Sequence, residues 1–400
     1  MRVGDLLGER YQLTGELGRG GFGVVWKAHD RTMGRAVAVK TLRRGGPLSA
    51  GDLGRWGREL EILAGLNHPN IVVVFDQGEA VGDGERTSYL VMELLDGPTL
   101  AKLIEQGRTE LLRGLDIGRQ LCAALTAAHA IRVVHRDVKP ENIMLVGPER
   151  DVVKVLDFGI AQIGDNRDGL TTEGSVIGST RYLAPERWRG DPGTVRSDLY
   201  SVGCVLYELF TGQRPFTSTS AIGLMAQHLD QPPLRPAGLP AELSDLIMRL
   251  LAKDPADRPA DADEVRGRLG RVADGIRGLR GRAELAWQAA GAGRAAESVS
   301  ELRLLVPEFV LAFGADDGRT LRTCQDLVIV LERAGEPAEA YTLLTELLAA
   351  ATLALGSAHP DVADLQRRLD RSEPPRIPHP PGVLAGALSG RPAAVNRTGA

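Results

Sequence analysis

One stretch of the sequence constrains the fold and the chemistry of this chain more than any other. His135-Arg136-Asp137-Val138-Lys139-Pro140-Glu141-Asn142 places an Asp, a Lys and an Asn in a short predicted loop, and Asp157-Phe158-Gly159 returns a second Asp after a predicted hairpin. Phosphoryl transfer requires a carboxylate near the attacking hydroxyl, a cation beside the moving phosphoryl group and oxygen ligands for Mg²⁺. The two motifs supply all of these groups and therefore indicate a phosphoryl-transfer site.

The two motifs resemble the catalytic segment of the bacterial eukaryotic-like (Hanks-type) Ser/Thr protein kinases. The other main motifs of that family are present in the family's order, so the resemblance runs from about Tyr11 to Leu269, two thirds of the chain. It implies an α+β, bilobal protein-kinase fold with a small β-rich N-lobe and a mainly helical C-lobe. It also implies ATP as the phosphoryl donor and Ser or Thr hydroxyls of proteins as acceptors.

The composition is that of a globular protein, and the length indicates two or three domains. Of the 400 residues, 43% are hydrophobic and 25% are charged, and the formal net charge of −4 gives no broad basic field for nucleic acid. The three cysteines are far apart and odd in number, so they indicate buried thiols in a reducing compartment, not a zinc site. With no recognisable signal peptide and no uncharged apolar run of about 18 residues, we expect a cytoplasmic protein without a membrane span.

Alternating apolar residues predict strands on both sides of a glycine-rich segment. Tyr11–Thr14 leads into Gly18-Arg19-Gly20-Gly21-Phe22-Gly23, and a second strand runs to His29. A strand after G-x-G-x-x-G favours a phosphate-covering hairpin over a dinucleotide fold, although a hairpin without any ligand fits this segment alone about equally well. Further strands are expected at 36–40, 71–75 and 88–93, and helices at 53–66, 111–130 and 198–210.

The resemblance assigns the nucleotide site to the N-lobe and to the hinge between the lobes. Lys40, at the end of a strand, grips the α- and β-phosphates in this family and pairs with a helix Glu, for which the spacing favours Glu59 over Glu61. The hinge corresponds to residues 92–95, whose backbone meets the adenine edge. Apolar residues on strands more often belong to the hydrophobic core than to a ligand site, so the adenine contacts of these side chains are implied by the resemblance alone. The residues implied to contact ATP are Leu17, Gly18, Gly20, Gly23, Val25, Ala38, Lys40, Met92, Glu93, Leu95 and Met144.

The resemblance gives each polar residue of the two motifs a role in the transfer. Asp137 accepts the proton of the substrate hydroxyl, and Lys139 steadies the γ-phosphoryl charge. Asn142 and Asp157 hold Mg²⁺, with Mn²⁺ as an alternative. Positioning and charge neutralisation are nearly all that this reaction requires from a protein.

Residues 162–180 are polar and resemble an activation loop, although such a composition is usually only a flexible loop. Thr171 and Thr172 are the candidate phosphorylation sites, with Arg136 as the partner of an added phosphate. Relatives usually carry Gly-Thr where this chain has Gly178-Ser179, which leaves the substrate preference open. Ser179 keeps the hydroxyl that is expected to bridge Asp137 and Lys139.

Two anchors outside the site are also implied by the resemblance. Asp198 is expected to accept backbone hydrogen bonds from the catalytic loop. Glu186, in Ala184-Pro185-Glu186, is expected to pair with Arg258 in a later turn.

The C-terminal region carries an internal repeat at an offset of 42 residues, in which Ala292–Ser298 matches Ala334–Ala340. The pattern resembles about two loose tetratricopeptide repeats, which implies a groove for a partner protein. A helical extension that packs on the kinase part or dimerises is the alternative. The expected organisation is an N-terminal segment (1–10), a protein kinase domain (11–270), a linker (271–282), helical repeats (283–371) and a disordered Pro/Gly/Ala-rich tail (372–400).

Two other classes of function fit parts of the sequence. A pseudokinase scaffold acting through its helical repeats would show damage at Lys40, Asp137, Asn142 or Asp157, and all four are intact. A small-molecule kinase of related fold would generally lack the Ala184-Pro185-Glu186 segment. We therefore expect a cytoplasmic Ser/Thr protein kinase that acts on proteins and on its own activation loop, with homodimerisation left open.

Overall fold

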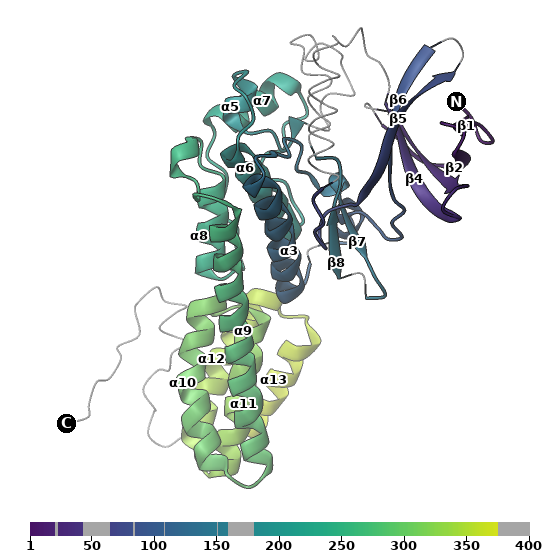
Figure 1. The fold of residues 1–400 in the computed structure, drawn as a ribbon. Coiled ribbons are helices and arrows are strands. Elements are labelled where there is room, and N and C mark those ends of the chain that lie inside the picture. Colours follow the sequence, from purple (N-terminus) through teal and green to yellow (C-terminus); the bar gives the residue numbers. More distant parts are fainter. Residues whose placement is uncertain are drawn as a thin grey trace. The chain divides into compact units, whose positions relative to one another are not determined.

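The computed structural model describes residues 1–20, 23–42, 65–82, 85–107, 109–149, 151–158 and 180–374. They form two compact units, one made of Met1–Arg235 and Leu246–Gly270, the other of Pro236–Asp245 and the chain from Arg271 onward. The first unit contains a six-stranded sheet followed mainly by helices, and the second is helical (Figure 1). The predicted protein-kinase fold, with a β-rich N-lobe and a helical C-terminal region, is confirmed.

The N-lobe is an antiparallel sheet in which two details differ from the prediction. The short strand β1 draws the N-terminal segment into the sheet, because Leu7 pairs with Tyr11. The strand expected at 71–75 begins only at Val74, because Ile71 forms a bridge with Val155 instead. The strand order is β1-β2-β3-β4-β6-β5, and the strands are β1 (Leu6–Leu7), β2 (Tyr11–Gly20), β3 (Gly23–Asp30), β4 (Arg35–Leu42), β5 (Val74–Gly82) and β6 (Glu85–Glu93).

Alternation along these strands gives the sheet two different faces. Trp26 pairs with Val39, which in turn pairs with Val91, and all three belong to one buried apolar cluster. Successive side chains of a strand point to opposite sides, so Lys40 and its neighbour Val25 lie on the other face. Burial of the apolar cluster fixes the register and therefore fixes which face carries Lys40.

Helices make up most of the remainder of the first unit. The helices predicted at 111–130 and 198–210 are confirmed as α3 and α6, whereas the helix expected at 53–66 lies almost entirely outside the described residues. Glycine allows α3 and α6 to approach closely, because a Cβ on Gly114 would lie 2.5 Å from Cε1 of Phe210. The elements after β6 are α2 (Leu100–Ile104), α3 (Leu111–Ala130), β7 (Ile143–Val146), β8 (Val152–Val155), α5 (Pro185–Trp188), α6 (Val195–Thr211), α7 (Ala221–Asp230), α8 (Ala241–Leu250) and α9 (Ala262–Gly291), of which α8 and α9 contribute residues to both units.

Residues 271–282, expected as a linker, lie inside the long helix α9. No proline interrupts this stretch, and Val272, Ala273 and Ile276 are buried at helical spacing. Burial of that apolar stripe explains why the segment continues the helix.

Four further helices follow in the second unit: α10 (Ala295–Phe313), α11 (Gly318–Ala334), α12 (Pro337–Leu355) and α13 (Pro360–Arg371). Each packs against the next along the chain (Figure 1). Both bounds of α12 lie 42 residues after those of α10, and the capping glycines Gly314 and Gly356 both have positive φ. The repeat seen in the sequence is therefore matched by repeated helices, while its assignment to the tetratricopeptide family stays a prediction.

Among the described residues, one helix, α12, is long and apolar enough by length and composition to cross a membrane. A single helix of this kind is weak evidence, because core helices of folded domains meet the same criteria. The inner side of α12 is buried at Leu344 and Leu347. Its first turn binds Arg303 of α10 through Glu339.

Candidate active site

The polar residues of the loop at 137–142 meet at one carboxylate oxygen. Nζ of Lys139 lies 2.6 Å from Oδ2 of Asp137, and the amide nitrogen of Asn142 donates to the same oxygen at 3.0 Å. The amide nitrogen of Asn142 also donates to the backbone oxygen of Asp137 at 2.9 Å. Both hydrogen bonds use the nitrogen of Asn142, so no residue that the structure describes here binds its amide oxygen, which can face a cation. The other Asp137 oxygen, Oδ1, accepts no hydrogen bond from any described residue.

Asp198 holds this loop from behind, as the resemblance implies. Its carboxylate accepts the backbone N–H groups of His135 and Arg136, each at 2.8 Å. Nε2 of His129, on α3, lies 2.8 Å from the same carboxylate. Arg136 has a φ of 67°, a left-handed conformation that costs energy for a residue with a side chain. The carboxylate of Asp198, 1% exposed, stabilises that conformation by accepting these two consecutive N–H groups.

The second motif is tied to the loop through His135. The imidazole Nε2 of His135 lies 2.8 Å from the backbone oxygen of Leu156, and its ring packs on Phe158 with centroids 4.5 Å apart. The backbone N–H of Leu156 donates to the backbone oxygen of Asn142 at 2.9 Å. The loop and the residues before Asp157 are therefore joined at several points.

Lys40 reaches this second motif from the N-lobe sheet. Its Nζ lies 2.6 Å from Oδ2 of Asp157, although the two residues are 117 positions apart in the sequence. The Lys40 side chain is 8% exposed, so this ion pair is shielded from solvent. Glu59, the expected partner of Lys40, lies outside the described residues, as do Thr171, Thr172 and Ser179.

The expected nucleotide-contacting residues fall into two groups. Gly18 pairs with Val25, Gly20 with Gly23, and Ala38 with Met92, so they lie on adjacent strands of one sheet, beside the exposed Leu17. The second group follows β6. Leu95 is partly buried, and Met144 on β7 forms a bridge with Thr99. The structure thus places Met144 against the segment that leaves the hinge.

The segment expected as the hinge carries an ion pair that the sequence does not predict. The carboxylate of Glu93 accepts the backbone N–H of Val73 at 2.9 Å and binds Nζ of Lys154 at 2.6 Å. Lys154, on β8, also donates to the backbone oxygen of Ile71 at 3.3 Å. No motif joins these positions, so only the fold brings them together. Both contacts use the same carboxylate oxygen, so the side chain of Glu93 ties the end of β6 to β8 and to the segment before β5.

The predicted pair of Glu186 and Arg258 is present and deeply buried. Nη1 of Arg258 donates to Oε1 of Glu186 at 2.8 Å and Nη2 donates to Oε2 at 2.9 Å, and the Arg258 side chain is 0% exposed. Burial raises the pKa of Glu186, but the hydrogen bonds to its carboxylate and the charge of Arg258 together outweigh burial and hold that pKa below its usual range. The hydroxyl of Ser197 adds a hydrogen bond at 2.8 Å.

A divalent cation is compatible with Asn142 and Asp157, because a free amide oxygen and a carboxylate are the hard ligands that such ions prefer. Within the described ranges no group of three or more His, Cys, Asp or Glu residues could hold a metal by itself. Two oxygen ligands from the protein suit an ion that takes its remaining ligands from phosphate and water.

Comparison with known proteins covers the same part of the chain. The protein kinase domain family matches residues 11–267. A probable serine/threonine-protein kinase of Streptomyces coelicolor, SCO3848, is 42% identical over 275 residues, which are 67% of this chain and 41% of that protein. The serine/threonine-protein kinase PknB of Mycobacterium tuberculosis is also 42% identical over 275 residues, 67% of this chain and 44% of its own length. The chain thus spans less than half the length of these curated relatives.

A solved structure of Rad53, residues 1–466 in complex with AMP-PNP, matches with a TM-score of 0.52 and 28% identity. The match covers 65% of this chain and 64% of that one.

Proposed function

Because the chain belongs to the protein kinase family, we propose that it transfers the γ-phosphoryl group of ATP to Ser and Thr hydroxyls of proteins. The observation that carries this proposal is the ion pair between Lys40 and Asp157, which joins the glycine-rich sheet to the loop of Asp137 and Asn142. The two similar bacterial proteins named as serine/threonine-protein kinases support the same acceptor class.

Asp137 is the proposed acceptor of the substrate's proton. Lys139 and Asn142 both bind Oδ2, which leaves Oδ1 to receive a hydrogen bond from the hydroxyl. As the hydroxyl oxygen bonds to phosphorus, the bond from phosphorus to the ADP oxygen breaks and the hydroxyl proton passes to Asp137. Lys139 lies close enough to Asp137 to neutralise charge that develops on the phosphoryl oxygens.

Nucleotide binding is proposed for the sheet face that carries Lys40. Lys40 would hold the α- and β-phosphates, with Glu59 as its second partner, beneath the glycines of β2 and β3. Ala38 and Met92, adjacent on that face, would pack on the adenine. The backbone N–H of Glu93 already donates to Val73, so its carbonyl and the N–H of Leu95 are the proposed hydrogen-bonding groups.

Mg²⁺ is the proposed cofactor, with Mn²⁺ as an alternative, and it would neutralise phosphate charge when bound. Asn142 Oδ1 and the carboxylate of Asp157 would hold it. In that state Asp157 would share its charge between the cation and Lys40.

Regulation is proposed for residues 162–180, with Thr171 or Thr172 phosphorylated by the chain itself and Arg136 binding the phosphate. Ser179 would bridge Asp137 and Lys139. The C-terminal helices are proposed to bind a partner protein or to regulate the kinase, and a cytoplasmic location is part of the same proposal. The alternative, a pseudokinase scaffold, is not favoured because all of its diagnostic positions are intact.

The full-length protein is tested with labelled ATP, Mg²⁺ and an acceptor protein, next to Asp137→Asn and to Asp191→Asn, a matched change at an exposed site. We expect label on Ser or Thr with the unmutated protein and with Asp191→Asn, and none with Asp137→Asn. Equal labelling by all three proteins, or none with any acceptor, would contradict the proposal.

A further inference from the structure

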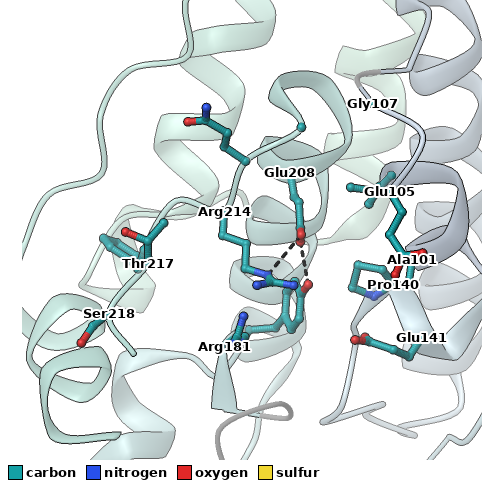
Figure 2. A pocket seen from close by; sticks show the side chains of 15 residues that line it. Ala101, Glu105, Gly107, Pro140, Glu141, Arg181, Glu208, Arg214, Thr217 and Ser218 are labelled. Carbon is teal, nitrogen blue, oxygen red and sulfur yellow. Dashed lines mark hydrogen bonds and ion pairs between the residues drawn. The ribbon is translucent and has the colours of Figure 1, made fainter. Parts of the chain in front are cut away.

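Beside the catalytic loop lies a pocket of about 510 Å³ that the proposed chemistry does not use (Figure 2). Pro140 and Glu141 form one wall, together with Glu105 after α2. Because Pro140 and Glu141 lie between Lys139 and Asn142, the pocket begins within two residues of the proposed phosphoryl site. A polypeptide advances about 3.3–3.6 Å per residue, so residues flanking an acceptor hydroxyl can reach it.

The innermost charge of this pocket is Glu208, in the last turn of α6. Its residue is only 6% exposed, and the carboxylate accepts the hydroxyl of Tyr182 at 2.6 Å. Burial and the adjacent carboxylate raise the pKa of Tyr182, so Tyr182 remains a protonated donor. A negative charge at the C-terminal end of a helix is unfavourable, and a cation there is favourable. Glu208 therefore requires a positive neighbour.

Arg214 supplies that positive charge from the same chain. Its Nε lies 3.1 Å from the carboxylate of Glu208. The Arg214 side chain is 38% exposed and that of Glu208 is 8% exposed, so the cation lies on the solvent side of the anion. Figure 2 shows Arg214 and Glu208 facing the wall that carries Glu105 and Glu141. A cationic side chain entering the pocket would approach Glu208 from the place that Arg214 already occupies.

The charge of the lining depends strongly on Arg214. Glu105, Glu141 and Glu208 stand against the two guanidinium groups of Arg181 and Arg214. With Arg214 present, a further guanidinium meets a neutralised Glu208 and a like charge, which is a repulsive element against basic side chains. Without it, three carboxylates face one guanidinium.

We propose that this pocket receives an uncharged substrate side chain near the acceptor hydroxyl, and that Arg214 sets this preference by occupying the site on Glu208 that a substrate Arg would take. The inference rests on the proposed function, since it names the substrate class of the same site. Arg214 is thus a specificity-determining residue that excludes basic side chains from one position of the substrate.

The test uses full-length protein and peptides with a single Ser acceptor. Each peptide carries Arg at one neighbouring position, and its matched partner carries citrulline, the uncharged isostere, at that position. The readout is the ratio of kcat/KM for the Arg peptide to that for the citrulline peptide. The proteins compared are the unmutated chain, Arg214→Ala, Arg214→Ala/Glu208→Gln and the control Arg189→Ala, an exposed Arg outside the pocket.

We expect Arg214→Ala to raise the ratio about tenfold at one position, which corresponds to about 1.4 kcal/mol of new discrimination. The double variant should return the ratio to that of the unmutated chain, because its carboxylate is gone, and Arg189→Ala should leave it unchanged. If Arg214→Ala is poorly folded by circular dichroism, Arg214→Gln removes the charge with a smaller loss of packing.

Two results overturn the inference: no position at which Arg214→Ala raises the ratio, or a rise that persists in the double variant. If no peptide is phosphorylated, the proposed function fails, and the inference about the pocket is then tested by peptide binding. In that case the Kd ratio of the same peptide pairs, measured by fluorescence anisotropy without ATP, must show the same pattern.

Discussion

Replacing either partner of the buried pair Glu186–Arg258 should destabilise the first unit, and by unequal amounts. In Glu186→Gln the guanidinium keeps the backbone oxygens of Ala252, Lys253 and Arg196, at 2.9, 3.1 and 2.8 Å. Breaking a buried pair costs about 3–5 kcal/mol, so we expect Glu186→Gln at the low end. Arg258→Met loses those three hydrogen bonds as well and leaves Glu186 buried with the hydroxyl of Ser197, so we expect about 5 kcal/mol.

For a unit of this size, about 3 kcal/mol lowers the melting temperature by about 6–12 °C. Thermal and urea unfolding followed by circular dichroism measure these shifts. The double variant Glu186→Gln/Arg258→Met should cost less than the sum of the single changes by about 2–3 kcal/mol. Asp263→Asn removes a carboxylate from an exposed pair with Arg266 and should leave the midpoint unchanged.

The pair also predicts a pH dependence. The pKa of Glu186 is lower in the folded state than its ordinary value of 4.5, so its stabilising contribution is complete above about pH 4.5. It is lost as the pH falls through the folded-state pKa, and the difference between the unmutated chain and Glu186→Gln should shrink there. The reasoning is refuted if the stability losses of the two single variants simply add in the double variant, or if Arg258→Met costs less than about 1 kcal/mol.

Four further predictions follow from other contacts. Asp198→Asn replaces an acceptor of two backbone N–H groups by an amide and should lower kcat about 10²-fold with correct folding, whereas Asp191→Asn should not. Lys154→Met removes the ion pair with Glu93 and should raise KM for ATP about five- to tenfold while kcat is retained. Lys154→Arg should restore part of the affinity for ATP. A fall in kcat as large as the rise in KM would contradict a positioning role for Lys154. Burial lowers the pKa of His228 from 6.5 to about 3, so the folded state loses stability as the pH falls below 6.5. In His228→Gln the free energy of unfolding should therefore depend less on pH below 6.5. Gly114→Ala places a Cβ against Phe210 and should cost about 1–3 kcal/mol in urea unfolding, while Gly278→Ala, with nothing within 4 Å, should not destabilise.

Motif spacing predicted those parts of the site whose residues follow one another closely or belong to a shared family pattern. Asp137, Lys139 and Asn142 lie within six residues, so a short loop alone brings them together. The anchoring of the loop by Asp198 came from the family pattern and is confirmed in the structure.

Other contacts were not predictable because neither periodicity nor motif marks them. His129 lies on a helix face and reaches Asp198 across 69 positions, and Lys154 reaches Glu93 across 61. Such pairs depend on how α3 packs on α6 and on how β8 lies beside the hinge. The helical character of residues 271–282 was missed because their glycines and arginines conceal the buried stripe.

The division of the N-lobe sheet into two faces has a consequence for how this protein can change over time. Substitutions along β4 alter one side chain each and leave its neighbours in place. Loss of a single residue inside the strand, such as Ala38, would by contrast make Val37 and Val39 direct neighbours, so that only one of them could still face the apolar cluster. Lineages that descend from this chain can therefore exchange single residues of β4 for others that fit the same face, but they must preserve the parity of the strand's length.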